Sequence, residues 1–153
     1  MVVQTGILIA MQWSEVVDFA RRAGWTTFIG TADAQGAPHV AIVAPGFTDG
    51  TVWFATRASS RKYRNLRENP RVAFHWPIDK PNEAPGELAA WGDATILHDS
   101  RDARERVWNA QILPYDLGGF WGSPDNPDLV FVEAPLRRAL LRGPDLVARV
   151  WNA

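Results

Sequence analysis

Short strand-like runs joined by tight turns constrain the fold of this chain more than any other feature of its sequence. Three such runs follow one another, each rich in β-branched and aromatic residues: 25–31, 38–44 and 51–56. The connections between them, which contain Asp33 to Gly36 and Asp49-Gly50, are too short for the crossover that two parallel strands need. We therefore expect these strands to pair in antiparallel order, and a doubly wound parallel sheet is excluded.

The rest of the pattern adds further strands with helices between them. A helix is predicted over residues 13–23, with Ser14 as its N-cap and Gly24 after its end, and a second from Ser100 to about Gln111. Further strands are predicted over residues 71–78, 87–98 and 129–132, with 135–141 continuing the last one and a final amphipathic piece at 146–151. About six short strands with inserted helices predict a mainly β (α+β) protein, a six-stranded, mostly antiparallel barrel with helices at its rim.

Size and composition limit the class of protein. With 153 residues, 46% of them hydrophobic and 22% charged, we expect a single domain over residues 13–153 and an N-terminal extension or first strand over 1–12. The apolar run near the N-terminus lacks a basic front and is far shorter than the ~20 residues that span a bilayer, so no export signal or membrane anchor is predicted. The absence of cysteine excludes disulfides and favours a cytoplasmic location.

One basic segment, residues 57–71, stands out in an otherwise mildly acidic chain. It holds six Lys or Arg against one Asp or Glu, which gives a local charge of +5. Because the net charge of the chain is −1, the remaining residues together carry a charge of −6. A patch of this size suits a small anionic ligand better than a long polyanion.

The basic segment is predicted to contain a short helix, capped by Ser59 or Ser60 and ended by Asn69-Pro70. Arg61 and Lys62 then occupy the first turn, where acids rather than bases are stabilising because a helix N-terminus is already partly positive. Free backbone N–H groups, a serine hydroxyl and two flexible cations can together bind a phosphate. The alternative is a basic helix that simply faces water.

Histidines and aromatic residues give weaker signals. His39, His75 and His98 are too widely spaced for a built-in metal site. Eight tryptophans predict a large buried aromatic area, with some lining a pocket for a flat ligand or a subunit interface. The Gly- and Pro-rich segment 112–128 carries Phe120 and Trp121, which either cover the chain's own core or contact a ligand or partner subunit.

A string of short motifs, spread over most of residues 13–141, carries a family resemblance. It comprises Val40 to Val43, Val52 to Thr56, Ser60 to Lys62, Asn65-Leu66, Glu68 to Val72, Trp91 to Ala94, Val107 to Asn109, Phe120 to Gly122 and Asn126 to Asp128. In these motifs the chain resembles the flavin-binding split-barrel superfamily typified by pyridoxamine 5′-phosphate oxidase, and within it the general stress protein 26-like branch. The resemblance implies an antiparallel split β-barrel that binds FMN.

The resemblance also implies where the cofactor would lie. The implied cofactor-binding residues are Thr56, Ser60, Arg61 and Lys62 for the flavin phosphate, His39, Val40, Ala41 and Ile42 on the strand facing the isoalloxazine ring, and Trp121. The resemblance also implies a homodimer with two flavin sites at the interface, which surplus tryptophan, including Trp121, would suit. His39 could act near the ring, although a lone histidine on a strand is more often structural.

Two departures from the oxidase limit the expected function. His39 and Ala44 stand where the oxidase presents an Arg and a Lys, and its late Arg-x-His motif is missing, so oxidation of pyridoxamine phosphate is not expected and no catalytic residue is assigned. We expect an FMN-binding, redox-active protein with a small-molecule substrate of unknown identity. One alternative is the same fold holding F420 or haem, with Arg57 and Arg64 serving the longer anionic tail of F420. Another is a non-catalytic stress protein that binds nucleic acid through the basic helix.

Overall fold

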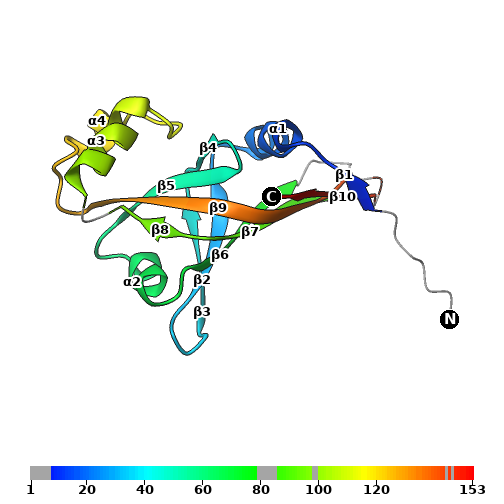
Figure 1. Cartoon of the computed structure of the whole chain (residues 1–153), viewed down its shortest axis with the longest axis horizontal. Helices are drawn as coiled ribbons and strands as arrows, with labels where there is room; N and C mark the ends of the chain where they lie inside the picture. Colours follow the sequence, from blue (N-terminus) through cyan, green and yellow to red (C-terminus); the bar gives the residue numbers. More distant parts are fainter. Residues whose placement is uncertain (1–7, 79–85, 98–99, 144, 146) are drawn as a thin grey trace.

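The protein is built on one open, mostly antiparallel sheet with helices at its ends (Figure 1). The computed structural model describes residues 8–78, 86–97, 100–143, 145 and 147–153. Its strands are β1 (Leu8–Ala10), β2 (Thr27–Ala32), β3 (Pro38–Val43), β4 (Gly46–Thr48), β5 (Thr51–Arg57), β6 (Arg71–Ile78), β7 (Gly86–Asp93), β8 (Thr95–Ile96), β9 (Leu129–Arg142) and β10 (Ala148–Asn152). Its helices are α1 (Trp13–Ala23), α2 (Arg61–Glu68), α3 (Arg101–Ala110) and α4 (Leu117–Trp121).

The long strand β9 joins the two parts of the sheet. Its first half pairs with β5 and its second half with β7, while β10 and β8 add further pairs along it. The main path runs β1-β10-β9-β7-β6-β2-β3, and its two ends do not pair with each other. The barrel is therefore open, as expected for a split barrel, and Figure 1 shows β9 running through the middle of the molecule from the end that carries α3 and α4 toward β10.

The number of strands differs from the prediction. Within the described ranges there are ten rather than six. β4 was not predicted and β8 was expected as part of a longer strand, while β1 lies in the segment expected as an extension or first strand and β10 in the final amphipathic piece. The β1–β10 pair is parallel, whereas the other strand pairs among these residues are antiparallel, including the predicted β2–β3 hairpin. Short edge segments carry too few residues for an alternating pattern to identify them.

The strand expected over residues 87–98 is divided in two. The pairing register of β7 with β9 shifts between Trp91 and Gly92, and β7 ends at Asp93 before the short β8 begins. A Cβ atom on Gly92 would collide with the backbone oxygen of Pro135, so only glycine fits this close approach. The register shift at Gly92 is a β-bulge or a similar irregularity, and His98 lies outside the described residues.

The helices begin and end close to the predicted positions. α1 spans the predicted range, but its N-cap is Gln12 rather than Ser14, and the Gln12 N–H donates to Glu15 Oε2 at 2.7 Å. Gly24 follows α1 with φ +148°, a conformation that side chains rarely adopt. The predicted loop 112–128 contains the short helix α4, whose two glycines concealed it in the sequence.

The buried residues form two clusters. The larger fills the barrel around Phe54, Phe74 and Trp76. The smaller lies under α3 and α4, where Val107 and Trp121 pack with Phe131 of β9. Trp121 is thus mainly a core residue of the end of the molecule that carries these helices. No helix in the part of the chain that the structure describes is long and apolar enough to cross a bilayer.

Candidate functional site

A pocket of about 450 Å³ opens where the ends of β3 and β5 meet α2 and α4. Its size is that of sites for small molecules and cofactors. The described residues that line it are Trp25, Thr26, Ile42, Val43, Ala44, Ala55, Thr56, Arg57, Ser59, Ser60, Lys62, Tyr115, Phe120 and Trp121. One part of the lining is hydroxylic and cationic, and the other part is apolar and aromatic. Such a lining suits a ligand with an anionic end and a flat apolar body.

The N-terminus of α2 supplies the polar part of the pocket. Of the two serines predicted as caps, Ser60 is the N-cap, and its Oγ accepts a hydrogen bond from the Tyr63 N–H with an N···O distance of 3.2 Å. The same Oγ lies 3.0 Å from Thr56 Oγ1 at the end of β5, so one hydroxyl pair joins the strand end to the helix start. The predicted partners Thr56 and Ser60 are thus brought together in the pocket wall.

A buried polar contact fixes the direction of α2. Asn65 is buried, and its Nδ2 donates to Thr31 Oγ1 on β2 at 3.0 Å. Leu66, the next residue, is buried in the barrel core. Because both contacts hold the helix against the barrel, its first turn stays beside the pocket.

The two cations predicted for the first turn of α2 have different positions. Lys62 lines the pocket, and burial lowers the pKa of its ammonium group from the ordinary value. Within the described residues Lys62 forms no ion pair, so an anion in the pocket would meet an uncompensated charge. Arg61 is exposed and does not line the pocket, and its predicted role in phosphate binding stays a prediction.

Arg57 is a second cation in the pocket wall, but it is already paired. Its Nη1 donates to Asp128 Oδ2 at 2.9 Å, and the guanidinium lies 5.4 Å from the ring centre of Trp121 and 5.8 Å from that of Phe120. The hydrogen bond from Arg57 is the largest cause that holds the pKa of the Asp128 carboxyl below its ordinary value. Arg64 is not a pocket residue, since its Nη1 donates to the Ser59 carbonyl oxygen at 2.9 Å.

The aromatic wall comes from α4 and the loop before it. Trp121 is only 6% exposed, and its indole N–H donates to the Tyr115 hydroxyl at 3.0 Å. Burial raises the pKa of Tyr115, and the hydrogen bond from Trp121 opposes this rise. Phe120 is 61% exposed and packs edge-on against the rings of Tyr115 and Trp121. The first interpretation of this pair is confirmed for Trp121, which packs in the core. Both residues also line the pocket, and contact of either with a ligand or partner stays a prediction.

The β3 strand contributes less of its length than predicted. Ile42 lines the pocket together with the two residues that follow it, whereas His39, Val40 and Ala41 are not part of the lining. Side chains alternate between the two faces of a strand, so this segment cannot turn every side chain toward one ligand. The contact predicted between the backbone of 39–42 and a flavin ring stays a prediction. Among the residues that the structure describes, no three or more His, Asp or Glu side chains are grouped so that they could hold a metal ion.

Sequence reasoning missed several residues of the pocket lining. Trp25 and Tyr115 were not predicted as site residues, and Phe120 was noted without a role in the cofactor site. Trp25 directly follows Gly24 and is 66% exposed, which is unusual for a side chain of this size. The signal for Tyr115 was its place among the glycines and prolines of a loop that also carries two aromatic residues.

The open barrel and its pocket place this protein among the small split-barrel proteins, and the sequence defines the family. The family model described as pyridoxamine 5′-phosphate oxidase matches residues 14–139. This is most of the chain, which therefore belongs to that family.

Individual relatives agree with this assignment. A pyridoxine/pyridoxamine 5′-phosphate oxidase of Anaeromyxobacter dehalogenans is 36% identical over 88 residues, which are 52% of this chain and 44% of that protein, so the match spans less than half of the relative's length. The crystal structure of a Clostridium acetobutylicum protein related to general stress protein 26 superposes with a TM-score of 0.70 at 19% identity, over 93% of this chain and 96% of that one.

A haem-binding protein of Mycobacterium smegmatis also has this fold. It superposes with a TM-score of 0.71 at 14% identity, over 95% of this chain and 60% of that one. At such identities the two structural matches establish the fold alone, and they confirm the predicted split barrel.

Proposed function

We propose that this protein binds FMN without a covalent bond and acts as a redox flavoprotein on a small-molecule substrate. The observation that carries the proposal is the pocket, in which Lys62 and the serine-capped start of α2 face an apolar, aromatic wall. FMN has the matching parts, a terminal phosphate and a flat ring system. When bound, the flavin supplies the electron transfer, and the protein supplies binding, orientation and exclusion of water.

The phosphate end fits the donors that are present. Free backbone N–H groups at the start of α2, the hydroxyl groups of Thr56 and Ser60 and the ammonium group of Lys62 are all hydrogen-bond donors to a phosphate. Burial makes the Lys62 charge unfavourable in the empty pocket, and a bound phosphate would offset that cost. The same donors would hold the ribityl phosphate at one end and so fix the direction of the ring.

The apolar end fits a flat ring. One side of it is lined by the end of β3, with Ile42, Val43 and the following Ala44. The other side is lined by Phe120 and Trp121 of α4. Aromatic and aliphatic walls that exclude water favour the transfer of electrons to a bound ring over side reactions. No side chain of the lining stands out as a general acid or base, which leaves the substrate unassigned.

The alternative ligands are less well matched. Haem needs an axial His, Cys, Met or Tyr ligand, and the described lining holds only Tyr115, whose hydroxyl already accepts from Trp121. The two arginines that could serve the tail of F420 are bound to Asp128 and to the Ser59 carbonyl oxygen. Nucleic-acid binding by the basic helix is disfavoured, because Lys62 lies in a pocket rather than on an open stripe of cations.

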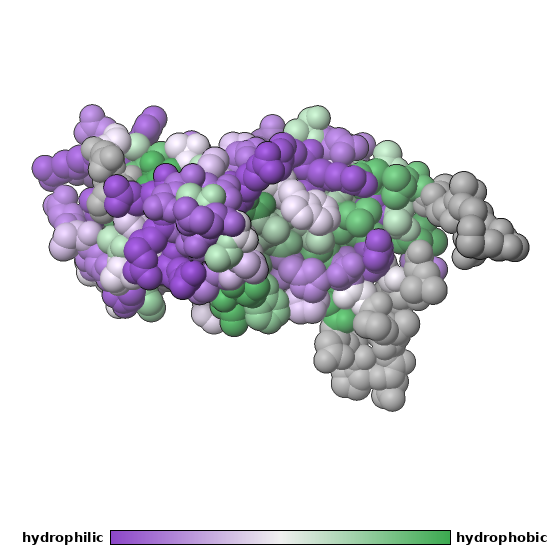
Figure 2. Space-filling view, turned by 90° about the horizontal axis from the view of Figure 1, so that it is seen from below, coloured by the Kyte–Doolittle hydropathy of each residue, from purple (hydrophilic) through white to green (hydrophobic). Residues whose placement is uncertain are grey.

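A second copy of the chain is proposed to cover the exposed apolar face of β2 and β3. Phe28 of β2 pairs in register with Ile42 of β3. The exposed fraction is 42% for Phe28, 58% for Ile42 and 68% for Val40. The view from below in Figure 2 shows hydrophobic groups over the middle of the molecule among hydrophilic surface. Ile42 also lines the pocket, so a homodimer through this face would bring the partner close to the ligand. The cytoplasmic location expected from the lack of cysteine stays a prediction.

The first experiment is to purify the protein, record its absorbance spectrum, release any bound cofactor and identify it by mass. The proposal expects FMN, or a colourless protein that binds added FMN with quenching of flavin fluorescence. Co-purification of F420 or haem in its place, or failure to bind added FMN, would overturn it. The dimer is tested separately by light scattering of the wild type and of Val40→Glu, which should be monomeric.

A further inference from the structure

The two cations of the pocket wall differ in whether they have an ion-pair partner, and this difference affects which anions the pocket can bind. Lys62 forms no ion pair among the described residues, whereas Arg57 is paired with Asp128 at 2.9 Å. The following inference rests on the proposed function, since it concerns the same pocket. It assigns a role to Asp128, which does not itself line the pocket.

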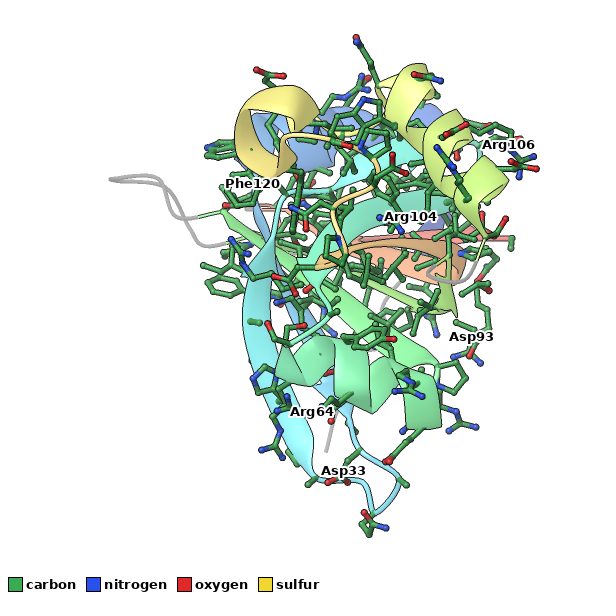
Figure 3. The ribbon with its side chains drawn as sticks, turned by 90° about the vertical axis from the view of Figure 1, so that its left-hand side faces the viewer. Asp33, Arg64, Asp93, Arg104, Arg106 and Phe120 are labelled. Atoms are coloured by element: carbon green, nitrogen blue, oxygen red, sulfur yellow. The ribbon has the colours of Figure 1, made fainter. Side chains whose placement is uncertain are left out.

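Asp128 is held in place by a chain of hydrogen bonds that begins on α3. Arg104 Nη2 donates to the carbonyl oxygens of Pro124 at 2.6 Å and Asn126 at 2.8 Å, and Figure 3 shows Arg104 reaching inward from α3. Asn126 Nδ2 donates to the Trp121 carbonyl oxygen at 2.9 Å, and Asn126 Oδ1 accepts from the Asp128 N–H at 2.9 Å. The loop after α4 is therefore tied to α3 and to the aromatic wall before it reaches Asp128.

Asp128 in turn fixes the turn that leads into α2. Its Oδ2 accepts from Arg57 Nη1, its Oδ1 accepts from the Ser59 N–H at 3.4 Å, and its carbonyl oxygen accepts from the Ala58 N–H at 2.9 Å. The carboxylate thus neutralises Arg57 and holds its guanidinium beside the rings of Phe120 and Trp121. A guanidinium that is paired and stacked in this way is not available to a ligand as a free charge.

We infer that Asp128 is a positioning residue that sets the charge selectivity of the pocket. By pairing with Arg57 it leaves Lys62 as the one uncompensated cation of the described lining. One such cation beside a helix N-terminus matches a single phosphate, whereas two would also attract ligands with several negative charges. The pocket is therefore built to favour a monophosphate such as FMN over polyphosphate-bearing ligands.

The test compares Asp128→Asn with wild type on three probes: FMN, riboflavin and inorganic triphosphate. Loss of the carboxylate frees the Arg57 charge, so triphosphate should bind about fivefold more tightly and FMN about twofold, from the strength of exposed charge pairs. Riboflavin carries no phosphate, and its affinity should not change. The gain for triphosphate should shrink at higher salt, since it comes from an exposed charge.

Two further variants separate this role from a merely structural one. Asp125→Asn is the matched control, because Asp125 lies in the same loop and its partner is Arg101, 3.6 Å away, on the outside of α3. It changes the net charge equally and should leave all three affinities unaltered. Arg57→Gln combined with Asp128→Asn should return the triphosphate affinity to the wild-type value.

The outcomes distinguish this inference from the proposed function. If FMN does not bind the wild type, the proposed function fails, and the triphosphate arm still decides the role of Asp128. Equal triphosphate affinity in wild type and Asp128→Asn, or an equal gain in Asp125→Asn, overturns the inference. If Asp128→Asn does not fold, Arg57→Gln serves instead: its triphosphate affinity should equal that of wild type, and a large loss would show that Arg57 already acts on the ligand.

Discussion

Two helices of this protein begin in the same way but have opposite surroundings. α2 is capped by Ser60 and α3 by Ser100, and in each the serine Oγ accepts from the backbone N–H three residues later at 3.2 Å. The first turn of α3 contains Asp102, and its Arg101 pairs with Glu105 at 3.2 Å. The first turn of α2 contains two cations and no acid.

The difference separates a folding signal from a functional one. The serine cap satisfies backbone N–H groups at both helices and is sufficient to start each of them. The first turn of α3 contains the acid Asp102, and its cation Arg101 is paired with Glu105, whereas the first turn of α2 has cations without an acid, beside a pocket. An arrangement that costs stability in the empty protein is expected where a ligand offsets the cost, so changes at the start of α2 should affect ligand binding and matched changes at the start of α3 should not.

Removal of both α2 cations has the largest expected effect. Arg61→Ala with Lys62→Ala should weaken FMN binding by at least about a hundredfold, because charge-assisted hydrogen bonds contribute ~1.5–3 kcal/mol each. Fluorescence titration measures the affinity, and circular dichroism checks the fold. The single variants sharpen the result, since Lys62→Ala should account for most of the loss, given that Arg61 lies outside the pocket lining.

Arg101→Ala is the control for this prediction, because it removes a cation from the corresponding turn of α3. Its partners are Glu105 and Asp125 rather than a pocket. FMN affinity should remain that of the wild type. Similar losses in Arg101→Ala and in the double variant would show a general effect of charge and contradict the phosphate site.

The two serine caps give the next largest contrast. Ser60→Ala and Ser100→Ala should each lower the free energy of unfolding by about 1 kcal/mol, as loss of an N-cap usually does. Only Ser60→Ala should also weaken FMN binding, about tenfold, since a hydrogen bond to a charged group is lost. Urea denaturation without ligand and FMN titration measure the two effects, and equal FMN affinity in both variants would remove Ser60 from the site.

The pKa of Lys62 predicts a pH dependence with opposite signs for stability and binding. Because burial lowers this pKa in the folded protein, the unfolded chain binds the proton more strongly, and stability should rise as the pH passes from the lowered value toward 10.5. A bound phosphate favours the ammonium form, so FMN affinity should fall over the same range. Lys62→Met should abolish both trends, as seen by thermal unfolding and titration across alkaline pH.

The smallest effect concerns the Arg57–Asp128 pair. The pKa of Asp128 is lowered in the folded state, so its contribution to stability is present above the ordinary value of 3.8 and is lost as the pH falls through the lower folded value. The difference in unfolding free energy between wild type and Asp128→Asn should therefore shrink on acidification. Denaturation at several acidic pH values measures it, and a difference that grows as the pH falls would contradict the pairing.

Much of the fold could be predicted from the sequence, because the signals were local. Gly24 marked the end of α1, the turn Asp33 to Gly36 marked the β2–β3 hairpin, and the serine before Arg61 marked the start of α2. Each depends on residues that are close in sequence and have strong backbone preferences. The split barrel itself rested on the family resemblance, which the family match confirms.

The remaining features depend on contacts between distant residues. The strand expected over residues 87–98 is divided where Gly92 closely approaches Pro135 of β9. The pairing of Arg57 with Asp128 joins residues 71 positions apart in the sequence. Likewise, the sequence grouped Arg61 with Lys62 as neighbours in one turn, but only the packing of α2 decides which of them lines the pocket. Adjacent residues on a helix point about 100° apart, so proximity in sequence does not imply a shared site.

The most direct test of the phosphate site compares FMN and riboflavin on the wild-type protein. The two ligands share the ring and the ribityl chain and differ only in the terminal phosphate. If the α2 N-terminus with Lys62 binds that phosphate, FMN should bind at least about a hundredfold more tightly, from two or more charge-assisted hydrogen bonds. Equal dissociation constants for the two flavins would contradict the assignment.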